Sequence, residues 1–182
     1  MFLPNTYEFY WNTSAEQFME RMHKEYIKFW NAERVDKASA MSLSTADVSI
    51  LASIVKSETN KADEMSRIAG VYINRLNRGM PLQADPTVIY AWGDFTIKRL
   101  LLKHLDIDSP YNTYKNTGLP PGPITLPEGH VIDKVLDYEK HNYLYFCAKE
   151  DLSGYHVFAN NYNDHQANAR RYQKALNKLN IR

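Results

Sequence analysis

Apolar residues return every three or four positions over most of the chain, the spacing that places side chains on one face of a helix. On this pattern we expect helices over about 14–30, 45–59, 61–78, 97–105 and 128–138, and a last helix from 164 onward. Capping signals mark where three of them begin: Thr13 with Glu16, Ser44 or Thr45, and Asn60. Gly79, followed by Pro81, predicts the end of the third helix.

Two short runs have a different composition. Residues 143–148 and 155–159 are rich in aromatic and β-branched side chains and flank a turn signal at Gly154, which predicts a β-hairpin. Residues 81–93 are expected to be irregular or partly extended, and the proline-rich stretch 109–127 to be a long ordered loop. The predicted fold class is therefore α+β, mainly helical with a small antiparallel sheet.

Composition narrows the classes of protein that remain. The chain has 182 residues, enough for about one domain with its own core, and 22 Lys and Arg against 21 Asp and Glu. This balance argues against a dedicated nucleic-acid binder, which usually carries a basic excess. The single cysteine, Cys147, excludes an internal disulfide and a cysteine metal cluster. Because no zinc-binding histidine pattern or phosphate-binding glycine loop is present, we expect no metal and no cofactor.

Glu58 is a charged residue at a position where the sequence pattern predicts an apolar one. It follows Leu51 and Ile54 or Val55 at spacings of three and four, so it shares the apolar stripe of the helix predicted over 45–59. Burial raises the pKa of a carboxyl group, and a place in the last turn, near the negative end of the helix dipole, adds to this effect. A carboxyl that stays protonated near neutral pH is what a glycosidase uses as its general acid.

A structural interpretation of Glu58 is equally simple. Its carboxylate could form an ion pair at the helix end with Lys56, Lys61 or Arg67, because such structural pairs are common. His156, in the predicted hairpin, is interpreted as a buried hydrogen-bonding residue rather than a catalytic base. The spacing alone leaves both interpretations of Glu58 open.

Polar side chains are unusually dense in the loops that follow. Amides, hydroxyls and aromatic faces of this kind line clefts that bind sugars, but they also form turns next to prolines. The residues concerned are Gln83, Asp85, Thr87, Asn112, Thr113 and Tyr114.

Several blocks of the sequence resemble the MltG (YceG-like) family of endolytic murein transglycosylases. The blocks are 51–59, 69–76, 79–90, 109–114, 118–122, 143–146 and 156–158. The resemblance implies an α+β fold with a lysozyme-like cleft and Glu58 as the catalytic acid/base. It also implies substrate-binding roles for residues on two of the blocks: Gln83, Asp85, Thr87, Asn112 and Tyr114.

The activity that the resemblance implies is cleavage of the β-1,4 bond between MurNAc and GlcNAc in nascent glycan strands. The products would carry 1,6-anhydro-MurNAc ends, and cleavage would terminate strand elongation. Two alternatives remain at this point: a non-catalytic peptidoglycan-binding or scaffold module, and a lysozyme-like hydrolase that uses a second carboxylate.

The resemblance also implies the setting of the protein. Residues 1–182 would be the catalytic domain of a single-pass protein of the bacterial inner membrane, with the domain in the periplasm. The membrane anchor and a LysM-like subdomain would precede this chain, which we expect to be soluble by itself because its apolar runs are short. The implied partners are peptidoglycan glycan strands and peptidoglycan synthases.

Overall fold

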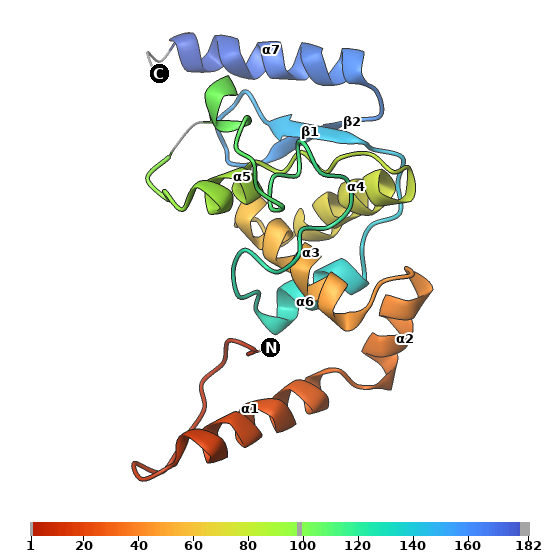
Figure 1. The fold of residues 1–182 in the computed structure, drawn as a ribbon. Helices are drawn as coiled ribbons and strands as arrows, with labels where there is room; N and C mark the ends of the chain where they lie inside the picture. The colour runs from red at the N-terminus through yellow and green to blue at the C-terminus, as the bar shows by residue number, and fades with distance from the viewer. Residues whose placement is uncertain (1, 98–99, 179–182) are drawn as a thin grey trace.

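The computed structural model describes residues 2–97 and 100–178, and it confirms the α+β class (Figure 1). The helices are α1 (Ala15–Phe29), α2 (Ala32–Ala40), α3 (Thr45–Glu58), α4 (Met65–Asn77), α5 (Asp85–Trp92), α6 (Gly129–Leu136) and α7 (Tyr162–Lys178), with a 3-10 turn at Leu102–His104. The strands β1 (Tyr145–Ala148) and β2 (His156–Ala159) form an antiparallel hairpin, in which Tyr145 lies opposite Ala159. The predicted hairpin is thus confirmed.

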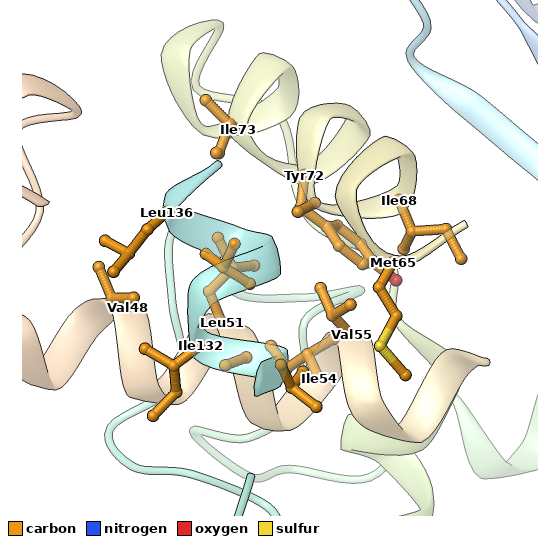
Figure 2. Packing of buried hydrophobic residues seen from close by; sticks show 14 of the residues in the cluster. Val48, Leu51, Ile54, Val55, Met65, Ile68, Tyr72, Ile73, Ile132 and Leu136 are labelled. Atoms are coloured by element: carbon orange, nitrogen blue, oxygen red, sulfur yellow. The ribbon is translucent and has the colours of Figure 1, made fainter. Parts of the chain in front are cut away.

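The hydrophobic core lies where α3, α4 and α6 meet (Figure 2). Every residue of α3 from Val48 to Val55 is buried, so this helix runs through the interior instead of lying on its surface. Leu51 and Ile54 of α3 and Ile132 of α6 are completely enclosed. Because the rigid core holds α3 on all sides, the last residue of the helix, Glu58, has a fixed position.

The hairpin lies between α4 and α7, as Figure 1 shows. Side chains alternate along β1, and the two faces meet different helices. Phe146 packs edge-to-face on Tyr72 of α4, with the ring centres 5.8 Å apart, whereas Tyr145 stacks on His165 of α7 at 5.2 Å. The hairpin therefore joins α7 to the helical core.

Two helices were not predicted. Helix α2 has only one buried side chain, that of Ala38, so it carries no apolar stripe that a periodicity could reveal. Helix α5 lies in the stretch 81–93, which was expected to be irregular or partly extended. Its Pro86 occupies the first turn, where a helix needs no backbone N–H from it.

Several predicted helix ends are corrected. Ser14 rather than Thr13 caps α1, in a capping box with Gln17. Helix α4 begins after Glu64 instead of Asn60, and α7 begins at Tyr162, before the expected Asp164. The helix predicted over 97–105 is only a 3-10 turn, although part of that prediction, 98–99, lies outside the described residues, as does the end of the last helix, 179–182.

The longest helix within residues 2–97 and 100–178 is α7, with 17 residues. No single helix there is both long and apolar enough to cross a membrane. Helices α2 and α3 meet the length and composition criteria only as a pair, and the pair is bent by 79°.

Candidate active site

A cavity of about 480 Å³ lies between the helical core and the layer formed by the hairpin and α7. Glu58 enters it from the end of α3 and remains partly accessible. The other lining residues come from α4, the segment that leads into α5, the loop at 114, the hairpin and α7: Tyr72, Arg75, Leu82, Gln83, Asp85, Tyr114, Tyr145, Phe146, Cys147, Ala148, His156, Tyr162, His165 and Tyr172. Tyrosine and histidine rings therefore make up much of the wall opposite Glu58.

The carboxyl group of Glu58 is held by one hydrogen bond. The hydroxyl of Tyr72, a side chain only 2% exposed, donates to Glu58 Oε1 over 2.5 Å. Burial raises the pKa of Glu58 to about 7; the Tyr72 hydrogen bond opposes this rise, the negative charge of Asp85 adds to it, and the positive charge of Arg75 opposes it. The sequence predicted a raised pKa from burial, and the structure adds Asp85 as a second cause.

None of the three cations considered as ion-pair partners for Glu58 has that role. Lys56 binds Glu128 over 2.5 Å, and Arg67 binds Glu139 over 2.9 Å. Lys61 lies over the ring of Tyr155, with its Nζ 4.7 Å from the ring centre. The structural interpretation of Glu58 as one half of a salt bridge with these residues is therefore wrong.

A second carboxyl group, that of Asp85, lines the same cavity. It lies at the start of α5 and accepts a short hydrogen bond from the hydroxyl of Tyr114. Burial, together with the charge of Asp85, raises the pKa of the Tyr114 hydroxyl, so this hydroxyl stays protonated and remains a donor. Asp85 and Tyr114, for which the resemblance implied a common cleft, are thus joined by a hydrogen bond.

Arg75 links the parts of the cavity wall. It is 7% exposed, and its Nε donates to the Leu144 carbonyl over 2.6 Å, just before β1. Its Nη1 donates to the Leu82 carbonyl over 2.9 Å and to Gln83 Oε1 over 3.2 Å. One buried cation therefore fixes both the hairpin and the segment before α5.

Gln83 has a backbone conformation that is rare for a residue with a side chain. Its φ is 50°, in the left-handed region, and its N–H donates to the Thr113 carbonyl over 3.0 Å. Strained residues of this kind are frequent at binding sites, where the surrounding structure holds them. The Gln83 side chain lines the cavity and accepts a hydrogen bond from Arg75.

Two of the five expected substrate-binding residues are not on the cavity wall. Thr87 is fully buried, and its hydroxyl bonds the Ala84 carbonyl and the hydroxyl of Thr113. Asn112 is also fully buried; its Nδ2 donates to two loop carbonyls over 2.9 Å and its Oδ1 accepts from the Tyr114 N–H. The structure brings Gln83, Asp85 and Tyr114 together with Glu58 and leaves Thr87 and Asn112 behind the wall.

The sequence analysis did not identify Tyr72, Arg75 or the aromatic residues of α7 as residues of the site. Their spacing is that of ordinary core residues, so it carried no functional signal. His156 forms a hydrogen bond as predicted, with its Nδ1 3.0 Å from Glu64 Oε2, but it is partly rather than fully buried.

Within residues 2–97 and 100–178, no group of three or more His, Cys, Asp or Glu side chains is arranged to hold a metal ion.

The fold and the cavity together define a class of α+β domain in which one raised-pKa carboxyl group lies at the end of a buried helix. Residues 1–171 match the YceG-like family, and the chain belongs to this family.

Similar proteins come from three bacteria. The chain is 39% identical to an endolytic murein transglycosylase of Bacillus subtilis (strain 168), over 91% of this chain and 45% of the relative. It is 33% identical to one of Streptococcus pneumoniae (strain D39), over 91% and 30%. A solved structure of a YceG-like protein from Listeria monocytogenes is 37% identical, with a TM-score of 0.77, over 90% of this chain and 53% of that one. The chain thus spans about half or less of each of these three proteins.

The raised pKa of Glu58 predicts how stability depends on pH. Between pH 4.5 and about 7 the folded protein keeps a proton on Glu58 that the unfolded chain has lost, so the free energy of unfolding falls as the pH rises. The total loss is at most about 3 kcal/mol. Urea denaturation at pH 5 and pH 8 should show that Glu58→Gln gains stability relative to the wild type at the higher pH. An equal difference at both pH values would contradict the assignment.

Proposed function

We propose that this chain is the catalytic part of an endolytic lytic transglycosylase, with Glu58 as its single acid/base. The observation that carries the proposal is the Glu58 carboxyl, with a pKa of about 7, facing a cavity without a neighbouring cation in salt-bridge contact among the described residues. The names of the relatives, endolytic murein transglycosylases, support the choice of murein as the substrate. A carboxyl of this pKa can donate a proton and later take one back near neutral pH.

In the proposed first step, protonated Glu58 gives its proton to the oxygen that joins MurNAc to GlcNAc. The C1–O bond of MurNAc breaks, positive charge develops on C1 and the ring oxygen, and GlcNAc leaves with its new hydroxyl. The Glu58 carboxylate that remains is stabilised by the hydrogen bond from Tyr72.

In the second step, the same carboxylate takes the proton of the C6 hydroxyl of MurNAc. The C6 oxygen attacks C1 of the same ring, which closes the 1,6-anhydro bridge and restores protonated Glu58. Because the nucleophile belongs to the substrate, the reaction needs no second carboxylate and consumes no water. The proximity of the C6 hydroxyl to C1 also lowers the entropic part of the barrier.

The remaining cavity residues would bind the sugar. We assign Gln83, Asp85 and Tyr114 to hydrogen bonds with substrate hydroxyls or with the developing charge, because their polar groups line the cavity. Thr87 and Asn112 would act indirectly, by fixing the loops that carry these residues.

One observation favours a second candidate, a lysozyme-like hydrolase. Asp85 lines the same cavity as Glu58, and its negative charge raises the pKa of Glu58. The second carboxylate of a hydrolase would have the same effect. A hydrolase would release reducing MurNAc ends instead of anhydro ends, because water would attack C1.

Mass spectrometry of glycan ends separates the candidates. Uncrosslinked peptidoglycan strands would be incubated with the protein and the new ends identified. We expect internal cleavage with 1,6-anhydro-MurNAc ends. Reducing ends would establish the hydrolase. If strands are bound but no new ends appear, and a longer protein of the relatives' length also produces none, the chain is a binding module.

The setting of the protein is part of the same proposal. Cleavage of nascent strands would end their elongation, and an N-terminal membrane anchor with a LysM-like subdomain would hold the domain in the periplasm, next to peptidoglycan synthases. The support is the family and the greater length of the relatives. Mean glycan length should fall in cells that overproduce the active protein.

Tyr72→Phe is expected to move the pH dependence of cleavage. The change removes the hydrogen bond that favours the Glu58 carboxylate but keeps the ring that packs on Phe146. The pKa of Glu58 should rise, so the loss of kcat/KM at alkaline pH should move upward by roughly one pH unit. Tyr145→Phe, in the same cavity, is the control and should leave the midpoint in place. An unchanged midpoint in Tyr72→Phe would show that this hydrogen bond does not act on the acid.

A further inference from the structure

Strand β1 borders the cavity along one of its edges. Four consecutive residues, Tyr145 to Ala148, line the cavity, whereas β2 contributes only His156. Side chains of a strand alternate between its two faces, so a cavity reached by four residues in a row lies beside the strand rather than on one face. The hairpin has two strands, so among the described residues this edge of β1 has no further strand against it.

The register shows which backbone groups point to that edge. Lys149 N–H donates to the Tyr155 carbonyl over 2.9 Å, which continues the pairing of β1 with β2. In an antiparallel pair, alternate residues direct both N–H and C=O to the partner strand, so Cys147 and Tyr145 also face β2. The N–H and C=O groups of Phe146 and Ala148 therefore point the other way, into the cavity.

The opposite edge of the hairpin confirms this alternation. His156 lies opposite Ala148, and its N–H points away from β1 and donates to Glu64 Oε1 over 3.0 Å. Glu64 thus covers the outer edge of β2. Arg75 covers the Leu144 carbonyl, just before β1, and the backbone groups of Phe146 and Ala148 have no partner outside the hairpin within residues 2–97 and 100–178.

Proteins usually protect free strand edges with charges, proline or a covering segment. Residues 145–148 contain no charge and no proline, and all four are only partly exposed. An edge of this composition, inside a cavity with a catalytic acid, is suited to a ligand that supplies backbone-like donors and acceptors.

We propose that the free edge of β1, at Phe146 and Ala148, binds a secondary amide group of the substrate through paired N–H and C=O hydrogen bonds. The inference rests on the proposed function and adds the chemical group that the enzyme recognises. An amide offers one donor and one acceptor, which match the one acceptor and one donor of a strand residue. In a murein strand, amides occur in the acetamido groups of the sugars and in the attached peptides.

The position of the edge favours a slender ligand over a second copy of the chain. The cavity beside β1 is also lined by Tyr72 of α4 and Tyr172 of α7, so these side chains flank the edge. The strand is only four residues long, which is short for a stable sheet between two chains. A glycan strand with its amide substituents is narrow enough to reach these groups.

Backbone amide NMR of the whole chain tests the proposal with matched probes. Tri-N-acetylchitotriose carries an acetamido group on each sugar, cellotriose carries hydroxyls in the same places, and an L-Ala–D-Glu dipeptide carries a peptide amide alone. We expect chitotriose or the dipeptide, but not cellotriose, to move the amide protons of Phe146 and Ala148 downfield, while Tyr145 and Cys147 shift little. The probe that produces this alternation identifies the source of the amide.

Other results would overturn the proposal. Equal shifts with cellotriose would show that hydroxyls suffice, and shifts without alternation would show proximity rather than edge pairing. Shifts that depend on protein concentration in the absence of a probe would mean that a second copy occupies the edge.

Ala148→Pro supplies a test by mutation. Proline removes an N–H that is not used in pairing with β2, a position at which strands tolerate it. Affinity for the recognised probe should fall about tenfold, because one hydrogen bond to the probe is lost. If Ala148→Pro does not fold, the alternation in the wild-type spectrum still decides. Anhydro ends without alternation would refute this inference alone, whereas alternation without cleavage would refute the proposed activity alone.

Discussion

Glu58→Gln is expected to reduce cleavage of glycan strands about a thousandfold, the range that a general acid/base contributes. Glutamine has the size of the native side chain and can still accept the hydrogen bond from Tyr72, but it cannot donate a proton to the leaving oxygen. The rate should be followed by mass spectrometry of the released anhydro ends. Thermal unfolding measured beside it should show that the fold is retained.

A matched change elsewhere controls for loss of charge. Glu139 is exposed and pairs with Arg67 on the surface, so Glu139→Gln should leave the rate unchanged. If Glu58→Gln cleaves strands at the wild-type rate, Glu58 is not the acid, and Asp85 becomes the first residue to test.

Arg75→Met is expected to lower the free energy of unfolding by 3 kcal/mol or more, since hydrogen bonds from a charged donor contribute about 1.5–3 kcal/mol each. The change fills a similar volume but leaves the carbonyls of Leu144 and Leu82 without their donor in a buried place. The hairpin and the segment before α5 would lose their common anchor. Urea denaturation at pH 7 measures the effect.

Arg78→Met is the control for this change, because Arg78 follows the same helix but is exposed. Its effect should stay within about 0.5 kcal/mol. Similar small losses for both variants would mean that the hydrogen bonds of Arg75 add little to stability.

The helical core was largely predictable from the sequence. Helices α3 and α6 bury broad apolar faces, and their spacing carries that information directly. Helix α2 was not predicted because its single buried residue, Ala38, leaves no periodic pattern. Helix α5 was not predicted because its stretch was expected to be irregular or partly extended, although its Pro86 fits the first turn of a helix. A proline shows that the backbone changes direction near it, but it does not show whether a helix or a loop follows.

The candidate site was predictable only where a residue conflicted with its surroundings. Glu58 stood out because a carboxylate on an apolar stripe needs an explanation, and its raised pKa has burial as the main cause, as expected. Tyr72 could not be recognised, because a tyrosine on a buried stripe is ordinary until its hydroxyl is seen to bond Glu58. Asn112 misled for the opposite reason, since an amide in a loop can serve the loop itself.

The span of sequence that encloses Glu58 has a consequence for how the protein matures. The acid lies at residue 58, but the opposite wall comes from the hairpin and from α7, as far as Tyr172. Until that later portion has docked, the cavity lacks its second wall. The complete cavity therefore requires segments that lie far apart in the sequence. If the proposed activity is right, a chain that ends before α7 should lack it.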